Sequence, residues 1–242
     1  MLIPLINLVK KYNLKINGVI HVGAHYGEEL FDYSKLKISS VHFFEPLEEN
    51  FLKLQEEIIK FNSIDIHSHC CALGNDEGER KIYLSSNKLE SSSLLEPDQH
   101  LVDHPEVSFI GESTVILKKL DQFHIENANF LNMDVQGYDL EVLKGAVKTL
   151  NYIDYIYCEV NRSSTYKNNA LIDDIDFFLS KYDFKRIETV WAGEKISWGD
   201  AFYIKKSKYK INFYYYLSSY FFRNILYIYI KIIYSLFRKL FK

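Results

Sequence analysis

Side chains that can take up a proton or bind a nucleoside follow five short apolar runs of the sequence. His25 follows the first run, Glu45 the second, Cys71 the third, Asp134 the fourth and Glu159 the fifth. Carboxylate and imidazole groups are common general acids and bases in enzymes. If the runs are parallel strands, their carboxyl ends meet at one edge of a sheet, where α/β proteins bind ligands. The spacing therefore predicts one shared site.

The turn after the first run has the features of a nucleoside-binding turn. Residues 18–27 read GVIHVGAHYG, in which Gly23 lets the backbone approach a ligand closely. Glu45 ends the next run, where a carboxylate can accept hydrogen bonds from ribose hydroxyls. Gly23 and Gly27 do not form G-x-G-x-x-G, which favours a nucleoside without a pyrophosphate, and S-adenosylmethionine is the candidate. The alternatives are an ordinary tight turn at Gly23 and a helix N-terminal carboxylate at Glu45.

Asp134 is a candidate for an active-site carboxylate. It ends an apolar run in the segment NMDVQG at 132–137, where Gly137 lets the chain turn. The alternative is a cap for a helix that begins near Asp139.

The histidines differ in what their positions imply. His67 and His69 lie on one face of an expected strand, a spacing that can bind a metal ion. No third ligand stands nearby in the sequence, so we expect a structural role and no metal site. His100 and His104 are loop histidines that could contact an acceptor. His25 lies on the turn itself and is a candidate for cofactor binding or catalysis.

The pattern of apolar residues predicts an α/β fold with a doubly wound, mostly parallel sheet. The predicted core strands are 19–22, 41–44, 64–70, 130–135 and 155–160, with helices at 27–36, from 46, at 140–150 and at 171–182. A closing antiparallel pair is predicted at 184–190 and 201–204, and added strands at 80–84 and 115–117. The irregular segment 85–112 is expected to shape the site of an acceptor.

Composition indicates one globular domain in a reducing compartment. The chain has 242 residues, of which 48% are hydrophobic and 25% charged. Cys70, Cys71 and Cys158 are an odd number of cysteines, and no signal-peptide pattern opens the chain, so a cytoplasmic location is expected. Residues 1–204 hold 20 basic and 32 acidic residues, an acidic balance that argues against nucleic acid as a partner.

The last part of the chain has a different composition. No acidic residue follows Asp200, whereas nine Lys and Arg residues do, which divides the chain into a domain at 1–205 and a tail at 206–242. From Arg223 onward a helical projection gives a basic stripe and a wide apolar face, as in helices that lie on a membrane surface. Packing on the domain, a homodimer seam, a membrane span and a strand are the alternatives.

Five segments of the sequence together resemble the FkbM-type methyltransferases. They are VIHVGAHYG at 19–27, FEP at 44–46, ALGNDEG at 72–78, LNMDVQG at 131–137 and VLKG at 142–145. The resemblance covers residues 18–205 and implies a class I, Rossmann-like methyltransferase fold with a seven-stranded sheet and S-adenosylmethionine as cofactor. Cofactor contacts are then expected from His21, Gly23, Ala24, His25, Glu45, Pro46, Cys71, Ala72, Asp134 and Gln136.

The chain departs from the family pattern at three positions. His21 stands where relatives usually carry Asp, His25 where they carry Asn, and Gln136 where they carry Glu. These changes affect contacts around the methionine part of the cofactor and remove one carboxylate that could act as a base. Asp134 is the first choice for the catalytic base, followed by Glu159 and His25.

The resemblance implies O-methylation of a hydroxyl on a sugar in a surface glycan or glycoconjugate. A carbohydrate or glycolipid acceptor would suit a peripheral enzyme on the cytoplasmic face of a membrane. The alternatives are a nicotinamide-dependent oxidoreductase and a membrane-tethered, nucleoside-binding module without catalysis.

Overall fold

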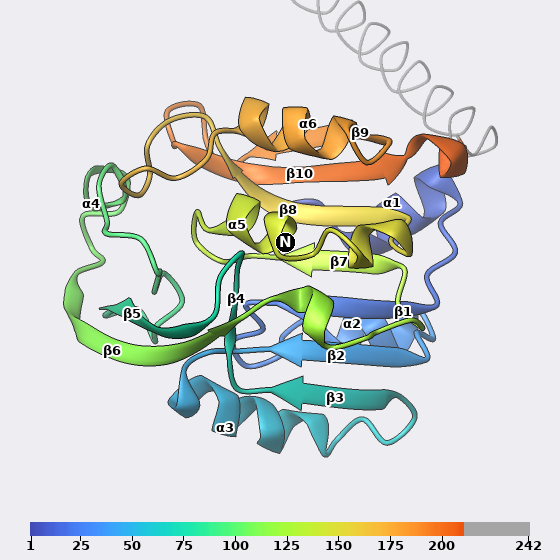
Figure 1. Cartoon of the computed structure of the whole chain (residues 1–242), viewed down its shortest axis with the longest axis horizontal. Helices are drawn as coiled ribbons and strands as arrows, with labels where there is room; N and C mark the ends of the chain where they lie inside the picture. Colours follow the sequence, from blue (N-terminus) through green and yellow to red (C-terminus); the bar gives the residue numbers. More distant parts are fainter. Residues whose placement is uncertain (211–242) are drawn as a thin grey trace, which may run out of the picture. The chain divides into compact units, whose positions relative to one another are not determined.

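The computed structural model describes residues 1–210, and most of the predicted tail lies outside these residues. Two compact units divide the chain: Met1–Ile3 and Ile16–Lys208 form the first, and α1 (Leu5–Tyr12) belongs to the second. The first unit contains a seven-stranded sheet of order β3-β2-β1-β7-β8-β10-β9 (Figure 1). Its strands are β1 (Gly18–Val22), β2 (Ser40–Phe44), β3 (Asp65–His69), β7 (Phe130–Met133), β8 (Tyr155–Asn161), β9 (Phe184–Trp191) and β10 (Trp198–Lys205).

All strand pairs in this sheet are parallel except those of β10, which is antiparallel to both β8 and β9. The helices between the strands are α2 (Leu30–Lys35), α3 (Glu48–Ile58), α5 (Asp139–Lys144) and α6 (Ile172–Ser180). The structure confirms the predicted α/β class, the seven strands and the closing antiparallel pair. The strand order agrees with the class I methyltransferase fold that the resemblance implies.

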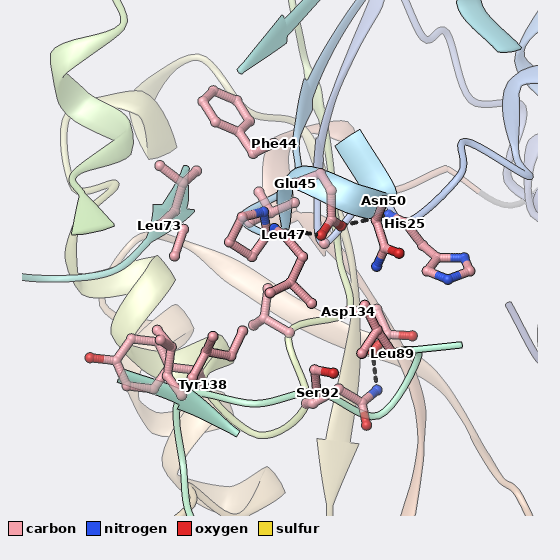
Figure 2. A pocket seen from close by; sticks show the side chains of 18 of the residues that line it. His25, Phe44, Glu45, Leu47, Asn50, Leu73, Leu89, Ser92, Asp134 and Tyr138 are labelled. Atoms are coloured by element: carbon pink, nitrogen blue, oxygen red, sulfur yellow. Dashed lines mark hydrogen bonds between the residues drawn. The ribbon is translucent and has the colours of Figure 1, made fainter. Parts of the chain in front are cut away.

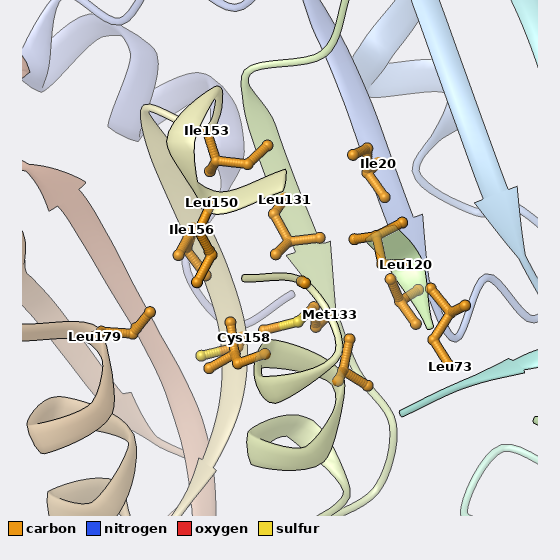
Figure 3. Packing of buried hydrophobic residues seen from close by; sticks show 14 of the residues in the cluster. Ile20, Leu73, Leu120, Leu131, Met133, Leu150, Ile153, Ile156, Cys158 and Leu179 are labelled. Carbon is orange, nitrogen blue, oxygen red and sulfur yellow. The ribbon is translucent and has the colours of Figure 1, made fainter. Parts of the chain in front are cut away.

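Successive side chains of the central strands point to opposite faces of the sheet, and this alternation determines which helix each side chain contacts. Ile20 and Val22 of β1 belong to the large apolar cluster with residues of α5 and α6, whereas His21 points to the other face and contacts Tyr33 of α2. Figure 3 shows Leu131, Ile156 and Cys158 in this cluster. Each fully buried aliphatic side chain contributes about 1.5–3 kcal/mol relative to an exposed one, so this cluster is the main source of stability.

The predicted helix at 140–150 is wrong in its second half. α5 ends at Lys144, and a short 3₁₀ turn, Thr149–Asn151, follows. Gly145 packs so closely that an added Cβ would lie 1.9 Å from the carbonyl oxygen of Gly74. The Asp121 carboxylate then accepts the backbone N–H groups of Lys148 and Thr149, each at 2.8 Å, which holds them away from a helical course.

A second, three-stranded sheet lies beyond the carboxyl ends of the parallel strands, at the left of Figure 1. It consists of β4 (Ala72–Leu73), β5 (Gly78–Ser85) and β6 (Phe109–Lys118), and α4 (His100–Asp103) lies between β5 and β6 along the chain. The predicted added strands exist, but β6 begins at Phe109, earlier than the predicted start at 115. The sequence did not predict this first part, because most residues of 109–114 are exposed and give no alternation of apolar and polar residues. Within residues 1–210, no helix is both long and apolar enough to cross a bilayer.

Candidate active site

The turn after β1 requires glycine at position 23. Gly23 has φ +78°, and a Cβ there would lie 1.9 Å from the carbonyl oxygen of Asp134 at the end of β7. The N–H groups of Gly23 and Ala24 both donate to the carbonyl of Phe44 at the end of β2, at 2.9 and 3.1 Å. The tips of β1, β2 and β7 are thus held together around a small-residue turn that leaves space for a ligand.

Glu45 is fixed at the tip of β2 by backbone donors. Its Oε2 accepts the N–H of His25 at 2.9 Å, and its Oε1 accepts the N–H of Leu47 at 3.0 Å (Figure 2). Only 4% of Glu45 is exposed, and this burial raises its pKa to about 7 against the opposing effect of the two N–H donors. Each carboxylate oxygen has further lone pairs, so Glu45 can still accept hydroxyl donors from a ligand.

A first cavity opens beside Glu45, with a volume of about 590 Å³ including its open mouth. Its apolar walls come from Leu47 after β2, Leu73 of β4, Ile82 of β5, Leu89 and Leu94 after β5, and Tyr138 before α5. An apolar slot with a few polar groups at one side is typical of sites for flat, ring-containing ligands. The small sheet and the segment after β5 therefore supply Leu73, Ile82, Leu89 and Leu94, most of the apolar wall that a nucleobase would contact.

A second cavity continues from the first and is lined mainly by polar side chains. The two cavities share Gly23, His25, Glu90, Asp134 and Gln136 in their linings. The second cavity has a volume of about 1430 Å³ including its open mouth. Ligands in the two cavities would therefore meet at the tips of β1 and β7.

Carboxyl groups converge on this junction. Asp134 follows β7, and Glu159 of β8 lies directly opposite Asp200 of β10 in the antiparallel pair. The hydroxyl of Tyr157 and the N–H of Leu2 donate to Oδ2 of Asp200. Neighbouring negative charges disfavour one another's ionised forms, so some of these carboxyls keep their proton at neutral pH.

The surroundings of Asp134 make it a candidate base. Its side chain has a large accessible area because it faces the second cavity, but protein atoms surround it on the other sides and limit its contact with bulk water. This desolvation, together with the charge of Asp200, raises the pKa of Asp134 to about 6, while a hydrogen bond from Gln136 lowers it. A base whose pKa is near neutrality suits general base catalysis.

Glu159 is less suited to that role. It is buried, and burial together with the charges of Asp134, Asp139 and Asp200 raises its pKa well above the usual value. A neutral carboxyl cannot remove a proton, so Glu159 is better suited to hold one.

His25 is engaged on both sides of its ring. Its Nδ1 lies 2.7 Å from Oε1 of Glu28, its Nε2 lies 3.1 Å from the carbonyl oxygen of Lys88, and its ring stacks on Tyr26. Burial alone would lower the pKa of His25, but the contacts with Glu28 and Lys88 outweigh it and raise the pKa. Neither ring nitrogen is free to take a proton from an acceptor, so the residue contributes its backbone N–H to Glu45 instead.

His21 takes part in a buried network on the other face of β1. The hydroxyl of Tyr33 donates to Nδ1 of His21 at 3.3 Å and accepts Nδ2–H of Asn132 at 2.9 Å. Burial lowers the pKa of His21, so its ring is neutral at pH 7.

The structure brings all predicted site residues to the two cavities. The first is lined by Gly23, His25, Glu45, Pro46, Cys71, Ala72, Asp134 and Gln136. The second is lined by His21, Gly23, Ala24, His25, Asp134, Gln136 and Glu159, and also by the loop residues His100 and His104.

Other lining residues were missed by the sequence analysis. Asp200 and Tyr157 line the second cavity, as does Trp198, whose Nε1–H donates to Nε2 of His104 at 3.0 Å. A sequence signal did exist for Asp200, because it immediately precedes a predicted strand that pairs with the strand of Glu159. The apolar walls after β5 had no periodic signal.

His67 and His69 lie away from both cavities. The ring of His67 stacks on that of His42 at 4.5 Å, and the ring of His69 stacks on that of Phe44 at 4.6 Å. Among residues 1–210, no group of three or more His, Cys, Asp or Glu side chains is arranged to hold a metal ion. All three cysteines are free thiols.

Comparison with known proteins identifies the family of the chain. The family model described as the methyltransferase FkbM domain matches residues 21–186, well over half of the chain. The chain is 29% identical over 104 residues to the 2-O-methyltransferase NoeI of Sinorhizobium fredii, a match that covers 40% of this chain and 43% of NoeI. The chain thus aligns with less than half the length of this relative.

A solved structure supports the fold. The crystal structure of methyltransferase FkbM from Methylobacillus flagellatus matches with a TM-score of 0.52 at 19% identity, covering 78% of this chain and 43% of that one.

The residues of the first cavity fit S-adenosylmethionine. Glu45 can hold the ribose hydroxyls, the apolar walls can hold the adenine, and Gly23 lines the cavity between them. The oxidoreductase alternative is excluded by the family match. The chain belongs to the FkbM methyltransferase family, has the class I methyltransferase fold and uses S-adenosylmethionine as its cofactor.

Proposed function

We propose that the protein is an O-methyltransferase that methylates a hydroxyl of a sugar in a surface glycan or glycoconjugate. The observation that carries this proposal is the position of Asp134, which lines both cavities at their junction and has a pKa of about 6. The description of NoeI as a 2-O-methyltransferase supports transfer to oxygen. The second cavity, lined by carboxyl, imidazole, hydroxyl and indole groups, suits a ligand rich in hydroxyls.

The proposed mechanism assigns a separate task to each group. S-adenosylmethionine supplies a methyl group that its positive sulfur has already activated for displacement. Glu45 would hold the ribose hydroxyls of the cofactor, and the turn at Gly23 would line its site. Asp134 accepts the proton of the acceptor hydroxyl as the new bond forms, because a sugar hydroxyl is too weak an acid to ionise at neutral pH.

Methyl transfer to defined carbohydrates tests this function. The purified chain is incubated with methyl-tritiated S-adenosylmethionine and a panel of free oligosaccharides, bacterial glycolipids and surface-glycan extract. We expect alkali-stable label in a carbohydrate fraction, because a methyl ether survives alkali and a methyl ester does not. Label found only in alkali-labile or amine-linked products would contradict O-methylation of a hydroxyl, and no transfer to any fraction would favour the non-catalytic alternative.

We also propose that residues 206–242 attach the enzyme to a membrane surface. The support is the nine Lys and Arg residues and the absence of acidic residues after Asp200 in the sequence. A flotation assay with anionic liposomes compares the full chain with a version that ends at Lys208. We expect the full chain to be recovered with the liposomes and the shortened version to be left behind. Equal recovery of both proteins with the liposomes would contradict the proposal. Size-exclusion chromatography of the same pair tests the alternative of a dimer seam.

A further inference from the structure

We propose that Gln136 is the positioning residue for the base: its side-chain amide orients the Asp134 carboxylate and keeps it ionised at neutral pH. The inference rests on the proposed role of Asp134 in proton transfer. It assigns to Gln136 a task in catalysis, in addition to the cofactor contact predicted from the sequence.

The amide nitrogen of Gln136 lies between two carboxyl groups. Nε2 is 2.6 Å from Oδ1 of Asp134 and 3.2 Å from Oε2 of Glu159. A primary amide carries two N–H donors, so one can serve each carboxyl. The shorter contact is the one to Asp134, which fixes one of its oxygens and leaves the other for an acceptor hydroxyl.

The surroundings of Gln136 determine which end of the amide faces the carboxyls. The hydroxyl of Tyr166, a fully buried side chain, lies 2.7 Å from Oε1 of Gln136 and 3.1 Å from the carbonyl oxygen of Ser91, and its one proton goes to the nearer acceptor, Oε1. The hydroxyl of Ser93 donates to the backbone carbonyl of Gln136 at 2.7 Å. Gln136 also adopts φ +53°, a conformation that a side-chain-bearing residue rarely adopts unless its surroundings impose it. The nitrogen end is therefore held toward the carboxyls.

The charges that face Asp134 favour its protonated form. They are Asp200 from β10 and Glu29 before α2, and the amino group of Met1 acts in the opposite direction. Glu159 from β8 and Asp139 of α5 also belong to this group of carboxyls, but their own pKa values are raised well above the usual range, so they hold their protons. A hydrogen bond from a neutral donor stabilises the carboxylate without adding charge. Glutamate at position 136, which the family resemblance leads one to expect, would add another negative charge at this place.

A direct measurement of the Asp134 pKa tests the proposal without an acceptor. Protein labelled with ¹³C at the Asp side-chain carboxyl is titrated by NMR, and Asp134→Asn identifies the resonance. In Gln136→Met, which keeps the length of the side chain but has no donor, the midpoint is expected to rise by about one to two pH units, the range for a lost hydrogen bond to a charged group. Tyr166→Phe removes the contact that orients the amide, and a smaller rise in the same direction is expected.

Gln99→Met is the matched control. Nε2 of Gln99 donates to Oδ1 of Asp103 at 3.1 Å, an amide–carboxylate pair of the same kind, and Gln99 lines neither cavity. This variant is expected to leave the Asp134 midpoint unchanged. An Asp134 midpoint that stays the same or falls in both Gln136→Met and Tyr166→Phe would overturn the proposal. Failure of the base assignment is distinct, because it would appear as full methyl transfer by Asp134→Asn whatever the NMR midpoint.

Discussion

The buried Glu45 carboxylate makes a specific prediction about how stability depends on pH. Burial raises the pKa of Glu45 in the folded protein from 4.5 to about 7. Between these two values the unfolded chain has lost the proton that the folded protein keeps, so the free energy of unfolding falls as pH rises. One pKa unit corresponds to about 1.4 kcal/mol, so Glu45 lowers the stability of the cofactor-free protein by about 3 kcal/mol between pH 4.5 and pH 7.

The substitution Glu45→Gln removes this titration. The Gln amide has only one acceptor oxygen, so it cannot accept both backbone N–H groups and the variant also loses hydrogen-bond energy. That loss does not depend on pH. Urea unfolding of both proteins at pH 5 and pH 8 separates the two effects. The decrease in stability from pH 5 to pH 8 should be smaller in Glu45→Gln than in the wild type by about 2–3 kcal/mol.

The exposed Glu77→Gln is the control, and its decrease should match that of the wild type. Equal decreases in the wild type and in Glu45→Gln would refute the reasoning, since Glu45 would then have the same pKa in the folded protein and in the unfolded chain. A larger decrease in Glu45→Gln would mean that the assigned direction of the pKa shift is wrong.

Three further substitutions test other parts of the account. Asp134→Asn should lower turnover by roughly 10²–10⁴-fold and leave cofactor affinity within a few-fold, measured by methyl transfer and calorimetry; unchanged turnover would remove Asp134 as the base. Gly23→Ala should lower the free energy of unfolding by at least about 1–2 kcal/mol, because the new Cβ meets the Asp134 carbonyl at a position with positive φ; an unchanged free energy of unfolding in urea would contradict the close packing of this turn on β7. Tyr33→Phe should cost about 1–3 kcal/mol in urea unfolding, since it leaves buried groups of Asn132 and His21 unpaired, and a neutral result would contradict that network.

The sheet could be predicted from the sequence because its central strands are buried on both faces. β1 and β8 consist entirely of buried residues and read as mostly apolar runs, interrupted by His21 in β1 and by Glu159 in β8. Parallel strands also bring their carboxyl ends to one edge, so the pattern of the five runs was enough to place the residues that follow them together. His25, Glu45, Asp134 and Glu159 all line one of the two cavities for this reason.

Features that depend on long-range contacts could not be predicted. The end of α5 depends on the close approach of Gly145 to Gly74 and on the carboxylate of Asp121, which are distant in sequence. The strand β6 is mostly exposed, so apolar and polar residues do not alternate along most of it and the sequence gives no strand signal there. The orientation of the Gln136 amide depends on Tyr166, thirty positions away along the chain.

The most direct test of the account is a crystal structure of the chain with S-adenosylhomocysteine. The ribose hydroxyls are expected within hydrogen-bond distance of the Glu45 carboxylate, with the adenine between Leu47 and Tyr138 and the sulfur directed toward Asp134. A nucleoside bound elsewhere, or a first cavity closed by the side chains that line it, would contradict the central claim.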